Sequence, residues 1–218
     1  MKIADNLYMY PEKGMLDCNT YVIKGKTGLI IDAGSADLIS TLVEDMGRDG
    51  IKPSDIGIIA NTHLHPDHSG ANQAFKNVSG ARIMLHLLQK QSIKVSLHET
   101  ANFFGMHPDG FKEDGCFTGN NLKEISLDWE MIPALGHSPD SVCYYSATHK
   151  CLVSGDVVFA GNIGRFDLPG GDAVQLANSI RKLSDLDVEL LLPGHMGIVR
   201  GAERVKANFR LALGFFEA

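Results

Sequence analysis

Three histidines and one aspartate lie within six consecutive positions, in the order His63, His65, Asp67 and His68, and this motif restricts the fold more than any other feature. The run Ile56–Ala60 ends two residues before it and is almost wholly apolar. A short run of this kind is typical of a strand buried on both faces. We therefore expect the motif at the carboxyl end of a buried strand.

The spacing of the motif suits two adjacent metal sites. Residues two apart in an extended segment project to the same side, so His63 and His65 can bind one ion together. Pro66 keeps His65 extended, because a proline disfavours the α conformation of the residue before it. Asp67 and His68 can then turn into the following helix and face a second ion. The arrangement differs from the H-E-x-x-H motif, in which both histidines share one helical face.

The rest of the pattern predicts two groups of strands, each followed by helices. The predicted strands are Leu7–Tyr10, Thr20–Gly25, Gly28–Gly34, Ile56–Ala60, Arg82–Leu85, Leu122–Ile125, Met131–Leu135, Val142–Ser146, Leu152–Ser154 and Glu189–Leu192. The predicted helices are Ala36–Arg48, Ala71–Phe75, a stretch from Leu87, Ala173–Leu183 and Ala202–Phe216. Two packed sheets with helices outside, an α/β fold of αββα layers in a single domain over residues 1–218, would cover every apolar face.

Composition narrows the partners and the compartment. With 20 Lys and Arg against 26 Asp and Glu, the net charge is −6, a poor match to a polyphosphate backbone, so nucleic acid is not expected. Apolar runs fall far short of the roughly 20 residues that cross a bilayer, and the N-terminus lacks a signal-peptide pattern. The four scattered cysteines fit reduced thiols. We expect a cytoplasmic protein that acts on a small molecule; a homodimer stays open.

Three further residues of metal-ligand type, His137, Asp156 and His195, stand in turns at the ends of predicted strands. With the first motif, they resemble the metallo-β-lactamase superfamily, and within it the glyoxalase II-like hydrolases, over essentially the whole chain. The matching pieces, in the order of that family, are THLHPDHSG, GHSPDS, SGDVVF, GNIGRFDLPGGD and PGH. The resemblance implies a first metal held by His63, His65 and His137. It implies a second held by Asp67, His68 and His195, with Asp156 as the bridge.

The resemblance also implies the chemistry. Imidazole and carboxylate ligands suit zinc, iron or manganese, and we expect two zinc ions. Two cations about 3.5–4 Å apart lower the pKa of a shared water and polarise a carbonyl or phosphoryl oxygen. Asp67 is the implied catalytic residue that orients this water. The expected activity is hydrolysis of a thioester or a related ester or lactone.

Substrate recognition is less constrained. A basic residue near the position of Arg165 contacts glutathione in glyoxalase II relatives, and a guanidinium can bind a carboxylate bidentately. Alternatively, Arg165 and Asp167 only brace their loop by a salt bridge. Glyoxalase II itself continues into a helical C-terminal domain, whereas this sequence stops at Ala218, so glutathione specificity is not implied. The family usually has glycine in place of Asp140, whose expected effect is confined to the turn of its own loop.

The segment between Leu87 and Asn121 contains a dense apolar set, expected to form a lid or pocket wall over the metals: Phe103, Phe104, Met106, Phe111 and Phe117. Local core or a dimer contact is the alternative. Two other functions also stay open. One is a mononuclear iron dioxygenase of the same fold that acts on persulfides, with a facial triad of His63, His137 and Asp156. The other is a non-catalytic metal-binding scaffold.

Overall fold

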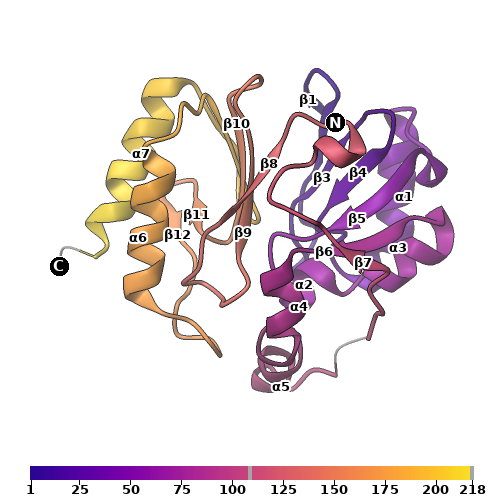
Figure 1. The fold of residues 1–218 in the computed structure, drawn as a ribbon, viewed down its shortest axis with the longest axis horizontal. Coiled ribbons are helices and arrows are strands. Elements are labelled where there is room, and N and C mark those ends of the chain that lie inside the picture. The colour runs from indigo at the N-terminus through magenta and orange to yellow at the C-terminus, as the bar shows by residue number, and fades with distance from the viewer. Residues whose placement is uncertain (108–109, 217–218) are drawn as a thin grey trace.

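Two β-sheets pack face to face in the computed structural model, which describes residues 1–107 and 110–216. Helices α1 (Ile39–Arg48) and α3 (Asn72–Ser79) cover the outer face of one sheet, and α6 (Ala173–Ser184) and α7 (Ala202–Gly214) cover that of the other (Figure 1). The predicted αββα layering in a single domain is therefore confirmed. None of the helices in the described ranges is long and apolar enough to cross a membrane.

The first sheet follows the order of the chain. Its strands are β1 (Lys2–Ala4), β2 (Leu7–Tyr10), β3 (Thr20–Ile23), β4 (Gly28–Ile31), β5 (Ile56–Ala60), β6 (Arg82–Leu85) and β7 (Gly115–Cys116). The strands from β1 to β4 are antiparallel, and those from β4 to β7 are parallel. Because parallel strands run in one direction, the carboxyl ends of β4 and β5 lie at the same edge.

The second sheet has the order β14-β13-β10-β9-β8. Its strands are β8 (Glu130–Pro133), β9 (Val142–Ser146), β10 (Cys151–Gly155), β13 (Leu190–Pro193) and β14 (Val199–Arg200). A small hairpin of β11 (Val158–Phe159) and β12 (Asn162–Ile163) follows β10. The β10–β13 pair is parallel, so the turns that follow these two strands lie next to each other.

Alternation along the strands builds the core. In β3, Tyr21 and Ile23 face the other sheet, whereas Val22 faces the helices. In β10, Val153 faces the first sheet and Leu152 packs toward α6 and α7. Both faces of each sheet are buried, which explains why β5 is apolar at nearly every position.

Short helical segments lie in the loops between these elements. They are α2 (Pro66–Ser69), α4 (Leu87–Ile93), α5 (Thr100–Phe103), a π-helical turn (Lys94–Glu99) and three 3₁₀ turns (Ala36–Leu38, Pro53–Asp55, Lys123–Ile125). The segment between Leu87 and Asn121 therefore contains α4, the π-helical turn and α5, and its residues 108–109 lie outside the described ranges. Three cysteines are buried, Cys116 is partly buried, and all four thiols are free.

The strand predicted at Leu122–Ile125 is wrong. Asn121 accepts a hydrogen bond from the Lys123 backbone N–H, and Ser126 adopts a left-handed backbone with φ of 62°. These features close a tight turn that buries Leu122 and Ile125 without extending the chain. Strand β1 was not predicted, because three residues are too short to show a pattern.

Candidate metal centre

The loops after the strands bring all seven predicted ligand residues to one end of the molecule. The β5–α2 loop carries His63 and His65, and α2 carries Asp67 and His68. The turns after β8, β10 and β13 supply the rest: His137, Asp156 and His195. The ligand set therefore comes from both sheets, and only their packing assembles it.

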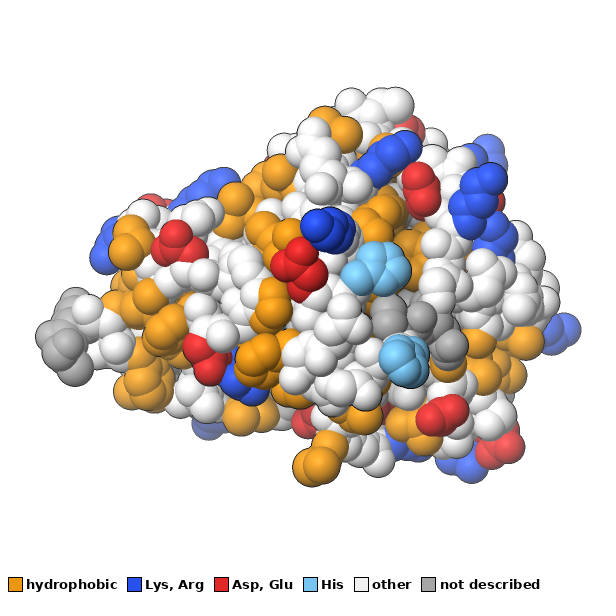
Figure 2. Space-filling view, turned by 90° about the horizontal axis from the view of Figure 1, so that it is seen from below, with side chains coloured by type: hydrophobic (Ala, Val, Ile, Leu, Met, Phe, Trp, Pro, Cys, Tyr) orange, Lys and Arg blue, Asp and Glu red, His pale blue; other side chains and the backbone are white. Residues whose placement is uncertain are grey.

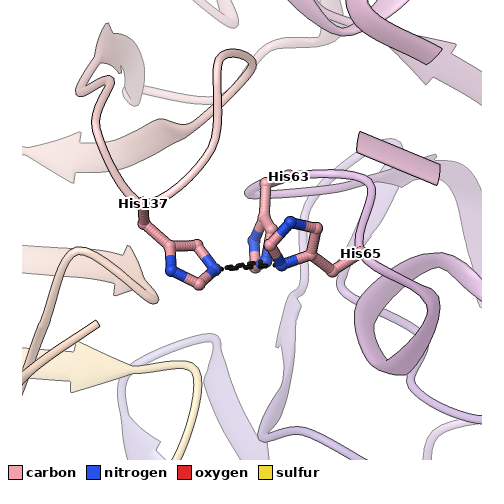
Figure 3. A group of neighbouring side chains, drawn as sticks. All are labelled: His63, His65 and His137. Atoms are coloured by element: carbon pink, nitrogen blue, oxygen red, sulfur yellow. Dashed lines mark hydrogen bonds between the residues drawn. The ribbon is translucent and has the colours of Figure 1, made fainter. Parts of the chain in front are cut away.

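The first group is a cluster of three buried imidazoles. His137 Nε2 lies 3.0 Å from His65 Nδ1 and 3.2 Å from His63 Nε2. Figure 3 shows the His137 ring pointing toward the other two rings, which approach from a different loop. Burial lowers the pKa of all three, that of His65 to about 3, so the rings are neutral and present lone pairs. Three lone pairs that converge on one point suit a metal cation.

The second group combines imidazoles with carboxylates. His195 Nε2 lies 3.3 Å from Asp67 Oδ2, and His68 Nε2 lies 3.8 Å from the same oxygen. Asp156 stands between the groups: its Oδ1 lies 3.2 Å from His68 Nε2, and its Oδ2 lies 3.4 Å from His195 Nε2 and 3.6 Å from His137 Nε2. This carboxylate is near residues of both groups, which is the position that a bridging ligand would take.

The residues present fit metal ions. Within the described ranges, His68 Nε2 and Asp156 Oδ1 are buried side-chain atoms without a hydrogen-bond partner, a costly state that a cation would relieve. Burial disfavours a charge on His195, but hydrogen bonds with Asp156 and Asp67 raise its pKa to about 10. The carboxylates of Asp67 and Asp156 therefore stabilise positive charge beside them, and bound divalent cations would supply that charge.

Two carboxylates that sequence reasoning missed hold the outer nitrogens of the ligand histidines. Asp32 Oδ2 lies 3.0 Å from His68 Nδ1, and Glu12 Oε2 lies 2.7 Å from His195 Nδ1. Such partners fix the orientation of a ligand histidine and leave Nε2 for the metal. Asp32 directly follows β4 in the run GLIID, a signal that could have revealed it. Glu12 lies in the β2–β3 loop, 183 positions from His195, and carries no local signal.

A cavity of about 420 Å³ opens over both groups of ligand residues. Most of its remaining lining is apolar: Met15, Leu16, Phe104, Met106, Phe159, Ile163, Leu168 and Met196. Figure 2 views the molecule from the end at which α5 lies in Figure 1 and shows hydrophobic side chains gathered between charged ones. The cavity can therefore take a ligand that joins a polar reacting group to an apolar body.

Arg165 lies on the lining of this cavity. Its guanidinium forms a two-fold salt bridge with Asp167, with N–O distances of 2.9 and 2.8 Å, and lies over the Phe104 ring. The backbone carbonyl of Arg165 lies 2.7 Å from His137 Nδ1 and orients that ring. The salt-bridge alternative is thus present in the structure, whereas substrate binding by Arg165 stays a prediction.

The aromatic segment divides between pocket and core. Phe104 and Met106 line the cavity, as the pocket-wall hypothesis predicts, and Phe103 is exposed and packs edge-on against Phe104. Phe117 is buried between the two sheets, and Phe111 packs against the helix-covered face of the first sheet. A wall role is therefore wrong for these last two residues, because their contacts are with the core.

The prediction for Asp140 is also wrong. Its side chain is fully buried and bonds to residues of two other segments, Leu64 and Ser96, as well as to its own loop. Burial raises its pKa to about 6.

The fold and the site together define an αββα protein in which loops from both sheets bring two adjacent groups of His and Asp side chains to one end of the molecule. The family model described as the metallo-beta-lactamase superfamily matches residues 14–195. The chain therefore belongs to the metallo-β-lactamase superfamily of metallo-hydrolases.

Relatives and solved structures agree with this assignment. The chain is 32% identical to a probable metallo-hydrolase of Methanocaldococcus jannaschii, over 81% of this chain and 86% of the relative. It is 32% identical to a hydroxyacylglutathione hydrolase of Haemophilus influenzae, over 84% of this chain and 86% of the relative. The BLEG-1 B3 metallo-beta-lactamase superposes with a TM-score of 0.78 and 28% identity, covering 94% of this chain and 99% of that one. TTHA1623 in a di-iron-bound form superposes with a TM-score of 0.73 and 26% identity, covering 88% of this chain and 94% of that one.

Proposed function

We propose that this protein hydrolyses a small thioester, or a related ester or lactone, with two divalent metal ions. His63, His65 and His137 would hold one ion, Asp67, His68 and His195 the other, and Asp156 would bridge them. The observation that carries the proposal is the position of Asp156, whose Oδ1 lies 3.2 Å from His68 Nε2 of the second group and whose Oδ2 lies 3.6 Å from His137 Nε2 of the first. We expect zinc, and iron or manganese also suit the ligands; a di-iron form exists for one structural relative.

Bound cations would supply a nucleophile at neutral pH, by lowering the pKa of a water, and would polarise the substrate carbonyl. Asp67 lies on the cavity lining with its Oδ2 3.3 Å from His195 Nε2, where its carboxylate could accept a hydrogen bond from that water and orient it. The apolar lining would hold the acyl or thiol portion and exclude bulk water from the reacting carbonyl. Arg165 at the edge would bind a substrate carboxylate after release from Asp167.

The relatives support an acyl-thioester substrate. The relative from Haemophilus influenzae is named a hydroxyacylglutathione hydrolase, and the alignment spans 84% of this chain. Cleavage of a thioester needs an electrophilic carbonyl, an attacking water and transfer of a proton from that water to the leaving thiolate, and the cavity of about 420 Å³ beside the ligand groups is where these would come together.

Elemental analysis and a thioester screen test the proposal together. We expect about two metal ions per chain, hydrolysis of at least one thioester, and a loss of about 100-fold or more in kcat/KM for Asp67→Asn, because this variant removes both a ligand and the water-orienting carboxylate. Asp185→Asn, at the exposed C-terminal end of α6, is the matched charge control. Full hydrolysis after complete metal removal would refute the proposal.

The second candidate is the mononuclear iron dioxygenase. His63, His137 and Asp156 lie together, with His137 Nε2 3.2 Å from His63 Nε2 and 3.6 Å from Asp156 Oδ2, so this triad could hold one ion by itself. One iron per chain and oxygen uptake with a glutathione persulfide would favour this function. Two metals and no oxygen uptake would exclude it.

A further inference from the structure

Asp140 is a buried carboxylate that has no role in the proposed hydrolysis, and its hydrogen bonds join three separate segments of the chain. It follows His137 by three residues in the β8–β9 loop, and none of its side chain is exposed. It accepts three hydrogen bonds: Oδ2 from the Leu64 backbone N–H at 3.0 Å, and Oδ1 from the hydroxyls of Ser138 and Ser96 at 2.7 Å each. Hydrogen bonds to a buried carboxylate are among the stronger ones in proteins.

Two of these partners belong to the ligand loops. Leu64 stands between His63 and His65, so the bond to its N–H fixes the peptide that spaces the two rings. Ser138 directly follows His137 and also lies 2.6 Å from the Ser141 hydroxyl, which closes the turn of that loop. Asp140 therefore joins the two loops that supply the three-histidine group.

The third partner, Ser96, lies in the segment that leads into the cavity wall. Ser96 lies in the π-helical turn Lys94–Glu99, a local irregularity that often accompanies function. The same segment continues into Thr100, Phe104 and Met106, which all line the cavity. The Thr100 hydroxyl also donates a hydrogen bond to the carbonyl of Val95, which ties the π-helical turn to the residues that line the cavity.

The residues that precede Asp140 and Ser96 in the sequence, Pro139 and Val95, pack closely against a third loop at Gly170. A Cβ added to Gly170 would lie 2.8 Å from Cδ of Pro139 and 2.9 Å from Cγ1 of Val95. Gly170 ends the loop that carries Arg165 and Leu168, which also line the cavity. The Arg165 loop thus meets Pro139 and Val95, which directly precede Asp140 and its partner Ser96 in the sequence.

We propose that Asp140 is a positioning residue that holds the wall segment Lys94–Met106 at a fixed distance from the three histidines, and that it thereby sets the length of acyl group the cavity accepts. The substrate part of this inference rests on the proposed function. A shift of about 1 Å in such a support can change a rate about 100-fold, so a single buried hydrogen bond has a measurable effect.

Ser96→Ala and Ser138→Ala form a matched pair, because each removes one hydroxyl that bonds to the same oxygen at 2.7 Å. Only Ser96 belongs to the wall. For Ser96→Ala we expect unchanged metal content, kcat within about twofold on the shortest thioester, and a KM for long-chain thioesters changed by about fivefold, the effect of one net hydrogen bond. For Ser138→Ala we expect no change in chain-length preference.

Amide hydrogen exchange of the metal-loaded protein gives a readout independent of hydrolysis. Ser96→Ala should lower the protection of residues 94–106 and leave that of α6 and α7 unchanged. If no thioester is hydrolysed by the wild-type protein, the proposed function fails, yet this exchange result still decides the role of Asp140. Equal protection of residues 94–106 in the wild type and in Ser96→Ala would refute the positioning role.

Asp140→Ala and Asp140→Asn complete the test. Alanine removes all three bonds, and we expect loss of metal as well as loss of chain-length preference. Asparagine can accept from the Leu64 N–H and donate to the two hydroxyls, which can turn to accept, so it should restore both properties. If Asp140→Ala does not fold, the serine pair and Asp140→Asn still decide the outcome; an Asp140→Asn protein with altered chain-length preference and normal exchange would contradict the proposal.

Discussion

Gly194 occupies a position beside the metal centre where even one methyl group has no room. A Cβ at this residue would lie 2.2 Å from Asp156 Oδ1, 2.8 Å from His68 Cε1 and 3.1 Å from the backbone carbon of Gly155. The first two neighbours belong to predicted ligands, and the third is backbone, which cannot swing aside. Gly194→Ala should therefore displace the carboxylate and the imidazole.

The displacement can be estimated from these distances. Ordinary contacts of a methyl carbon begin near 3.4 Å, so the Asp156 oxygen must retreat by about 1 Å. Overpacking of this kind costs about 1–3 kcal/mol of unfolding free energy, which a chain of this size can tolerate. A misplacement of about 1 Å at a reacting centre costs about 100-fold in rate. We expect a folded protein with about 100-fold lower kcat/KM and weaker binding of the second metal.

Gly197→Ala is the matched control, since a Cβ there meets nothing within 4 Å and the residue lies in the same β13–β14 loop. Metal content after dialysis, kcat/KM on the best thioester and the circular dichroism spectrum should be measured for both variants and the wild type. Gly197→Ala should match the wild type in all three. The reasoning would be refuted if Gly194→Ala kept both metals and a kcat/KM within about twofold of the wild-type value.

Three further outcomes are expected. Glu12→Gln should weaken metal binding about 10- to 100-fold in a competition titration with a chelator, because its carboxylate holds His195 Nδ1 at 2.7 Å; unchanged affinity would contradict this. Burial raises the pKa of Asp140 from 3.8 to about 6, so as the pH falls the folded state protonates this carboxylate before the unfolded state does. The free energy of unfolding, measured with urea, should therefore rise by about 1.4 kcal/mol more in the wild type than in Asp140→Asn when the pH falls from about 7 to 5. If the difference in unfolding free energy between the two proteins were the same at both pH values, the pKa of Asp140 would not be raised. Phe75→Ala, at a fully buried position, should cost about 3–5 kcal/mol in the same assay, whereas Val78→Ala, 55% exposed on the same helix, should change it by less than about 0.5.

The pattern of apolar residues along the sequence predicted those strands and helices that are long enough to show a clear hydrophobic periodicity. The apolar run Ile56–Ala60 is strand β5, and the motif from His63 lies at its carboxyl end as expected. The strand at Leu122–Ile125 was wrong because a run of four residues with two apolar members fits either a strand or a tight turn. Only the left-handed backbone at Ser126, which the sequence does not announce, distinguishes them.

The sequence by itself determined which residues are chemically able to bind a metal, because the residue types and the spacing of two in His63-x-His65 are local properties. The tertiary structure alone decided which carboxylates support them. Glu12 reaches His195, and Asp140 reaches Leu64 and Ser96, only because packing of the sheets and loops brings distant segments within 3 Å. Hydrogen bonds of this kind depend on positions in space, and no periodicity along the chain encodes them.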